Sequence, residues 1–128
     1  DQIDRINKDR EHIASEYAKS LTGTVLKQLP VIPKGMTRPN WHIYAIRFQK
    51  KELRDKFLKK MREKHIEVST HYVPLHGSPM GRKIAGKIRL PVTEEVGETL
   101  VRMPIYAGMT ERELEYVITA TKKVLKTI

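Results

Sequence analysis

The spacing of apolar residues changes several times along this chain, and that alternation restricts its fold more than any other feature. Steps of three and four residues predict long helices over 3–21, 51–64 and 110–128. Short runs of β-branched and aromatic residues predict strands over 41–48, 66–73 and 100–104. Helices interleaved with short strands predict one small α+β domain, with a mostly antiparallel three-stranded sheet covered by helices.

The first and last helices carry the clearest local signals. In the first helix, one apolar stripe contains Ile3, Ile6, Ile13, Tyr17 and Leu21. The last helix begins with a predicted capping box, in which Thr110 is the N-cap and Glu113 reaches back to it. Met109 and Leu114 stand where a hydrophobic staple would place them.

Proline and glycine mark the breaks between these elements. Residues 30–40 and 74–92 are rich in both and are predicted to be loops. A short helix is predicted over 93–98, directly before the last strand.

Size and composition exclude several classes of protein. The chain has 128 residues and no cysteine, so it suits one domain without disulfides or thiolate metal sites. No apolar stretch approaches the roughly 20 residues of a membrane span, and no apolar leader opens the chain, so we expect a cytoplasmic protein without a membrane partner. The formal net charge of +10 favours anionic partners, including phosphorylated small molecules and nucleic acid.

The densest chemical signal lies where the predicted strand over 66–73 enters a loop. His71, Tyr72 and His76 offer two imidazoles, a hydroxyl and a stacking face to a polar ligand. Read from burial preferences alone, however, His71 would more often be a half-exposed strand residue and Tyr72 a core aromatic.

Two further candidates lie on the first predicted strand. His42 and Tyr44 share one face of that strand, which could pair beside His71. A metal site built from His42, His71 and His76 is conceivable, but the spacing matches no tight ligand motif, so we expect none.

Basic residues supply two further alternatives. Arg82 and Lys83 could hold a phosphate, although a solvated basic turn is the commoner outcome of such a sequence. The basic run over 50–64 could contact nucleic acid, but its residues point several ways around the helix, and a solvated outer face is commoner. The residues alone therefore predict a basic α+β domain with a His/Tyr-rich loop and no complete catalytic set.

Several stretches, in order, resemble the C-terminal third of the DegT/DnrJ/EryC1/StrS sugar aminotransferases. The resemblance spans nearly the whole chain. It is carried by Arg10-x-x-Ile13-Ala14-x-x-Tyr17, Trp41-His42-Ile43-Tyr44, Arg54-Asp55, His71-Tyr72-x-Pro74-Leu75-His76, Leu90-Pro91-Val92-Thr93-Glu94, Arg102-Met103-Pro104-Ile105-Tyr106 and Gly108-Met109-Thr110-Glu111. The run over 74–81, with Arg102-Met103-Pro104, most resembles the branch that transaminates dTDP-4-dehydro-6-deoxy-D-glucose to dTDP-4-amino-4,6-dideoxy-D-galactose.

The resemblance implies that residues 1–128 are the C-terminal small domain of a fold type I, aspartate aminotransferase-like enzyme. It also implies pyridoxal phosphate, a homodimer, glutamate as the usual amino donor, and a nucleotide-diphosphate keto sugar as substrate for surface polysaccharide or related glycan synthesis. By resemblance, His71 is the first substrate contact, followed by Tyr72 and His76, with His42 and Tyr44 as weaker candidates. A basic nucleic-acid-binding or regulatory module is the alternative reading, although we do not expect nucleic acid as a partner.

The chain departs from the family in one respect. The family's Schiff-base lysine, pyridine-nitrogen partner and phosphate-binding residues belong to an upstream large domain that is absent from this sequence. We therefore expect no catalytic residue here, no cofactor bound to this chain alone, and no transamination by it. We also expect exposed apolar surface, including part of the stripe over 3–21, and hence self-association or a loosely held first helix.

Overall fold

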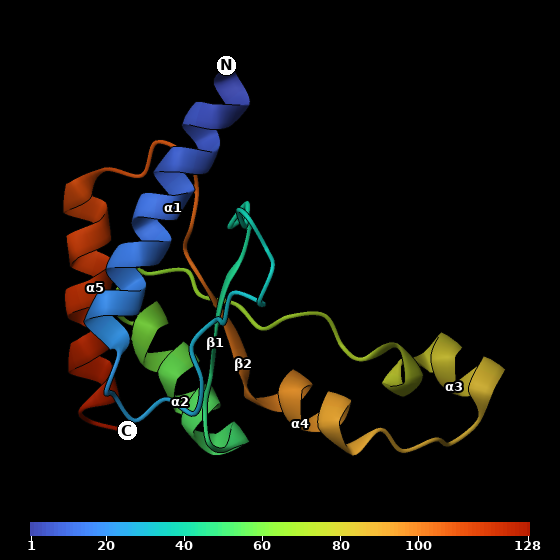
Figure 1. Ribbon diagram of the computed structural model, residues 1–128. Helices are drawn as coiled ribbons and strands as arrows, with labels where there is room; N and C mark the ends of the chain where they lie inside the picture. Colours follow the sequence, from blue (N-terminus) through green and yellow to red (C-terminus); the bar gives the residue numbers. More distant parts are fainter.

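The chain folds into a helical body from which one long arm projects (Figure 1). The computed structural model describes residues 1–128. The elements are, in order, α1 (Gln2–Leu21), β1 (Tyr44–Arg47), α2 (Lys51–Arg62), the short 3-10 helix η1 (Leu75–Gly77), α3 (Pro79–Ala85), α4 (Pro91–Thr99), β2 (Leu100–Met103) and α5 (Glu111–Leu125). The three long helices and the first and last strands were predicted from the sequence, whereas η1 and α3 form inside a segment predicted to be loop.

The sheet has one buried face. β1 and β2 pair antiparallel, with Tyr44 opposite Met103 and Arg47 opposite Leu100. Side chains alternate across a strand, so each strand sends every second residue into the body. The buried positions are Tyr44, Ile46, Val101 and Met103.

The predicted third strand is wrong. The segment over 66–73 pairs with β2 only at Ser69, which exchanges backbone hydrogen bonds of 2.7 and 3.3 Å with Arg102. Beyond Ser69 the chain leaves the sheet toward Pro74, and no further residue finds a backbone partner on β2. The alternation of residues 66–73 therefore describes an extended segment, because a strand also needs a neighbour along its length.

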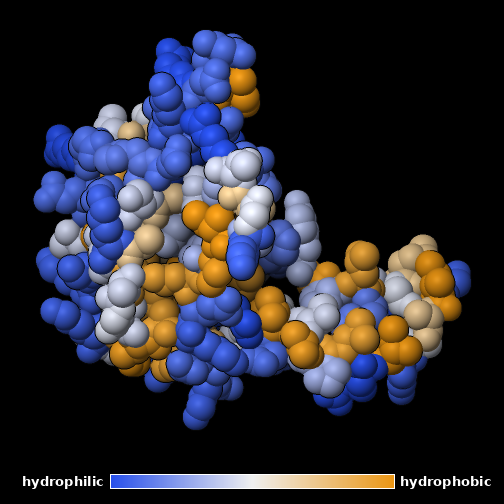
Figure 2. Space-filling view, viewed as in Figure 1, coloured by the Kyte–Doolittle hydropathy of each residue, from blue (hydrophilic) through white to orange (hydrophobic).

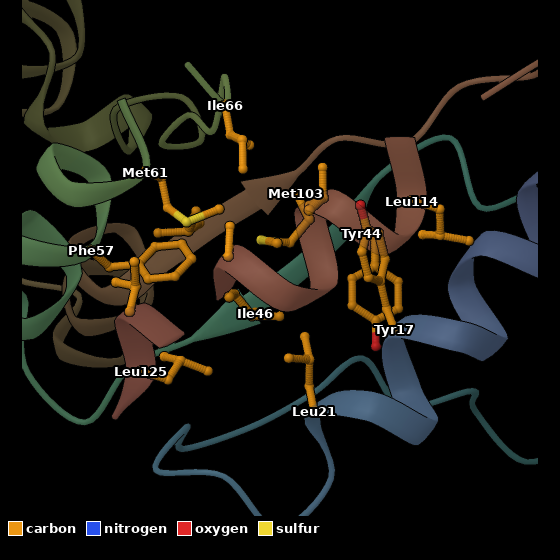
Figure 3. Close-up of a cluster of buried hydrophobic side chains, with 14 of the residues drawn as sticks. Tyr17, Leu21, Tyr44, Ile46, Phe57, Met61, Ile66, Met103, Leu114 and Leu125 are labelled. Carbon is orange, nitrogen blue, oxygen red and sulfur yellow. The ribbon is translucent and has the colours of Figure 1, made fainter. Parts of the chain in front are cut away.

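The core fills the space between the buried sheet face and three helices (Figure 3). α1 supplies Tyr17 and Leu21, α2 supplies Phe57 and Met61, and α5 packs on both of those helices. At the start of α5 the predicted capping box is present, with the Glu113 amide donating to Thr110 Oγ1 and the Thr110 amide donating to the Glu113 carboxylate.

Only the second half of the α1 stripe is buried. Ile13, Tyr17 and Leu21 are at most 2% exposed, whereas Ile3 is 53% exposed, because the first turns of α1 extend past the body (Figure 1). Part of the stripe is thus exposed, as predicted. Self-association and a loose first helix remain predictions.

Residues 70–90, which we call the arm, carry seven of the fourteen other large apolar residues that are exposed. No residue between Ile66 and Thr99 is buried. η1 and α3 pack mainly on each other at the far end of the arm, and apolar side chains gather there (Figure 2). The large apolar residues exposed on the arm are Tyr72, Val73, Leu75, Met80, Ile84, Ile88 and Leu90.

Two stacked tyrosines provide a matched test of the core. The rings of Tyr17 and Tyr44 lie 5.0 Å apart, and burial raises the pKa of Tyr44 to about 12 and that of Tyr17 further still, so both hydroxyls keep their protons. The Tyr17 hydroxyl donates to the Pro104 carbonyl at 2.7 Å, whereas the Tyr44 hydroxyl is buried without a partner.

We predict that Tyr17→Phe lowers the free energy of unfolding by about 1 kcal/mol, because it removes a buried hydrogen bond. Tyr44→Phe, the control, should leave that energy unchanged or raise it, because the removed hydroxyl makes no hydrogen bond. Urea denaturation of both variants measures the difference. Equal losses in the two variants would contradict the assignment of the Tyr17 hydrogen bond.

Candidate functional site

The arm leaves the body at Ser69 and is folded back by a corner between η1 and α3. Ser78 holds this corner, since its Oγ donates to the Leu75 carbonyl at 2.7 Å and accepts from the Gly81 amide at 3.0 Å. A Cβ atom at Gly81 would lie 1.8 Å from the Leu75 carbonyl oxygen, so only glycine allows this approach. The corner turns the chain back toward α4.

A close contact between Pro74 and Gly97 packs the arm against α4. A Cβ atom at Gly97 would lie 3.0 Å from Cγ and 3.2 Å from Cδ of Pro74. Glycine in a helix costs about 1 kcal/mol relative to alanine, so its position on α4 has a packing reason. The Pro74 ring occupies the space that a side chain at Gly97 would take.

The arm, α2 and α4 together enclose a hollow of about 650 Å³. Ten of its fifteen lining residues have polar or charged side chains, and three of the five predicted site residues are among them. The lining residues with chemistry to offer a ligand are Arg54, Thr70, His71, Tyr72, His76, Arg82, Lys87, Arg89, Glu94 and Glu98.

His71 and Tyr72 lie on the outer part of this hollow. Both side chains are exposed, Tyr72 to 81%, so neither belongs to the core. Their rings meet edge to face at a centroid distance of 5.0 Å and an interplanar angle of 60°. A ligand in the hollow can reach an imidazole and a phenol side by side.

His76 lies deeper and is held by Glu94. The side chain of His76 is 9% exposed, and its Nε2 lies 3.2 Å from Glu94 Oε1. Glu94 also accepts from the Leu90 amide at 3.0 Å and from Arg89 Nε at 2.9 Å. The Leu90 amide foremost, with His76 and Arg89 after it, holds the pKa of Glu94 below its ordinary value. Glu94 therefore joins η1, through His76, and the returning end of the arm, through Arg89 and Leu90, to α4.

Sequence reasoning placed the basic run of α2 on its solvated faces and so missed Arg54. The Arg54 side chain is 8% exposed, and its Nε donates to Asp55 Oδ1 at 2.6 Å. Arg54 shares a helix face with Phe57 and Met61, three and seven residues later, which is the periodic signal that could have found it. The only other indication of a role for Arg54 was that Arg54-Asp55 is one of the stretches that resemble the sugar aminotransferases.

His42 and Tyr44 lie elsewhere. His42 lines a separate hollow beside His65, Arg102 and Tyr116, and Tyr44 is buried in the core with 1% of its surface exposed. The histidines are thus divided between two hollows, and no group of three His, Asp or Glu side chains is placed to hold a metal ion. No helix is long and apolar enough to cross a membrane.

The lysines of this chain all lie at least partly exposed. An imine-forming lysine needs an amine with a depressed pKa, which burial supplies, and no lysine is among the buried residues. We therefore derive no step through pyridoxal phosphate from these residues.

Glu94 gives the arm a pH dependence with a defined sign. Because the folded pKa of Glu94 is lowered, its contribution to holding the arm is complete above the ordinary value of 4.5 and is lost as the pH falls through the folded pKa. We predict that the Leu90 amide and the His76 ring shift together in NMR spectra with a midpoint below pH 4.5. Glu94→Gln should abolish that shared transition, whereas Glu98→Gln, on the same helix, should keep it. A transition that survives in Glu94→Gln would show that another group holds the arm.

The sequence profile of the DegT/DnrJ/EryC1/StrS aminotransferase family matches residues 1–122. The uncharacterized protein MJ1066 of Methanocaldococcus jannaschii is 32% identical in an alignment of 125 residues that covers 94% of this chain and 32% of the relative.

Solved structures share the fold. DesV of S. venezuelae, in complex with a ketimine intermediate, is 29% identical and superposes with a TM-score of 0.85 over 98% of this chain and 33% of its own. The aminotransferase TlmJ of Streptoalloteichus hindustanus is 21% identical, with a TM-score of 0.88 over 98% of this chain and 33% of its own. This chain therefore spans about a third of the length of its relatives. Because the family profile covers nearly all of it, the chain belongs to the DegT/DnrJ/EryC1/StrS aminotransferase family.

Proposed function

We propose that this chain is the C-terminal small domain of a pyridoxal-phosphate-dependent aminotransferase that converts a nucleotide-linked 4-keto-6-deoxy sugar to its amino sugar, for surface polysaccharide or related glycan synthesis. Two findings support this proposal: the chain belongs to the family, and it aligns with about a third of the length of its relative. The dTDP-4-amino-4,6-dideoxygalactose branch is the substrate class we propose first. For the intact enzyme we also propose that glutamate is the amino donor and that the enzyme is a homodimer.

The observation that carries the proposal is the open wall formed by His71 and Tyr72, with His76 beside it. Sugars present hydroxyls for hydrogen bonding and apolar ring faces for stacking, and this wall offers groups for both. His71 donates or accepts at the ring substituents, Tyr72 offers its exposed face and hydroxyl, and His76 is oriented by Glu94. We assign the sugar contact to these three residues.

His42 and Tyr44 take no part in this assignment. The core position of Tyr44 leaves no room for a ligand at its hydroxyl, and His42 faces a different hollow. Since one sugar ring cannot span both hollows through the body, we restrict the proposed sugar site to the arm side of the molecule.

A nucleic-acid-binding or regulatory module is the second candidate. Lys51, Lys56 and Lys59 are exposed on α2, but Arg54 from the same run turns inward to the hollow. The charge of this helix is therefore not gathered on one face. Binding of an oligonucleotide with a steep salt dependence is the result that would favour this candidate.

Binding of the keto sugar nucleotide tests the proposed site. We predict that dTDP-4-dehydro-6-deoxy-D-glucose binds this chain weakly, and that His71→Ala weakens binding about tenfold, because it removes a hydrogen-bonding group from the wall. His12→Ala, an exposed histidine on α1, is the matched control and should leave the affinity unchanged. Isothermal titration calorimetry measures both. Equal affinities for all three proteins would remove His71 from the site.

The cofactor proposal has a separate test. We propose that this chain alone neither holds pyridoxal phosphate tightly nor transaminates, because its lysines are solvated. Absorbance spectra of the chain mixed with pyridoxal phosphate should show only imine bands that disappear on gel filtration. A protein-bound imine band that survives gel filtration would contradict this proposal.

A further inference from the structure

A further hollow lies between the C-terminal ends of α2 and α5, on the side of the body away from the arm (Figure 1). It measures about 250 Å³ and shares no lining residue with the hollow at His71. We call it the α2–α5 hollow. Its lining consists of Lys60, Glu63, Lys64, Lys123, Val124 and Thr127.

Cations dominate this lining. Three lysines and one glutamate give it a net formal charge of +2. Glu63 lies within ion-pair distance of none of the three lysines, and no other carboxylate pairs with them. The three ammonium groups therefore face a common space without an acidic partner.

One of these ammonium groups is already held in position. Lys60 Nζ donates to the Thr127 carbonyl at 3.2 Å and to Thr127 Oγ1 at 2.9 Å. The Thr127 hydroxyl donates in turn to the Val124 carbonyl at 3.0 Å, which fixes the orientation of its oxygen. An ammonium group has three protons, so one proton of Lys60 remains for a ligand.

Helix capping accounts for Lys60 but not for the other two lysines. Lysines near the C-terminus of a helix offset the partial negative charge of its free carbonyls, and Lys60 does so at Thr127. The side chains of Lys64 and Lys123 make no hydrogen bond to a carbonyl or to any other group of the chain. The Tyr116 hydroxyl donates to the Lys64 carbonyl at 3.0 Å, which ties the backbone of Lys64 to α5.

We propose that the α2–α5 hollow binds the phosphate group of a small phosphate monoester, with Lys60 as the fixed donor and Lys64 and Lys123 as donors beside it. A phosphate monoester carries a charge of about −1.5 to −2 near pH 7 and three acceptor oxygens. It therefore matches both the net charge of +2 and the three lysines. A carboxylate has one charge and two oxygens, so it would leave one ammonium group unpaired.

The same lining argues against nucleic acid as the ligand of this hollow. Proteins that bind single strands stack the bases on aromatic side chains, and no aromatic residue lines the α2–α5 hollow. The proposal does not depend on the proposed function, because it involves none of the residues assigned to the sugar.

Inorganic phosphate is the probe, titrated into this chain at an ionic strength held constant with sodium chloride. The backbone amides of residues 60–64 and 123–127 should shift in NMR spectra and reach saturation. The amides of residues 3–9, on the exposed half of α1, should stay in place. This measurement uses the unmodified chain.

Four single substitutions give matched variants, since none of the four lysines is buried. Lys64→Gln and Lys123→Gln should each weaken phosphate binding about five- to tenfold, because each removes a charge-assisted hydrogen bond. Lys59→Gln and Lys126→Gln remove the same charge beside the hollow but from positions outside its lining. Their affinities should stay within about twofold of the unmodified chain, because added salt screens charges that do not touch the ligand.

Three results would overturn the inference. The first is an absence of saturable shifts at residues 60–64 and 123–127. The second is an equal loss of affinity in all four variants, which would indicate a general attraction of anions by the net charge of +10. The third is tighter binding of a single-stranded oligonucleotide than of phosphate at the same lysines. The test of the sugar site at His71 uses a different ligand and a different variant, so either proposal can fail while the other stands.

Discussion

The covered face of a two-stranded sheet is the constraint on which the rest of this molecule depends. An isolated two-stranded sheet is marginal in water, so β1 and β2 persist because Tyr44, Ile46, Val101 and Met103 are buried against helices. The apolar faces of α1, α2 and α5 pack against that face of the sheet (Figure 3). No residue between Ile66 and Thr99 is buried in this core, and residues 70–90 of that segment project as the arm.

The arm is therefore held by local polar bonds and close backbone packing, where the body is held by a core. Four contacts hold it in place: the Ser69–Arg102 bridge, the Pro74 ring on Gly97, the Ser78–Gly81 corner and the hydrogen bonds of Glu94. Such a segment can present His71 and Tyr72 to a ligand because it is not committed to the core. The same arrangement leaves its apolar side chains exposed (Figure 2), and the relatives of this chain are about three times its length.

The positions of the charged residues around the hollow cannot be deduced from the overall composition of the chain. The net charge of +10 is spread over several surfaces, and most of the α2 lysines face solvent. Arg54 differs because α2 directs it toward α4 and the arm. Since Arg54 is buried, its electrostatic interactions are less screened by water than those of an exposed lysine. Arg82 and Lys83 are neighbours in sequence, yet only Arg82 lines the hollow, since successive helix residues point about 100° apart.

The sequence by itself determined the three long helices, the two strands that pair and the capping box of α5, because periodicity and capping depend on residues near one another in the chain. The third strand was predicted wrongly because alternation records only that a segment is extended, and pairing requires a partner along its length. Tertiary structure alone decided that Arg54 meets the arm and α4, that Tyr44 lies in the core, and that His42 is separated from His71. Each of these depends on which elements pack together across long stretches of chain, and no local pattern contains that information.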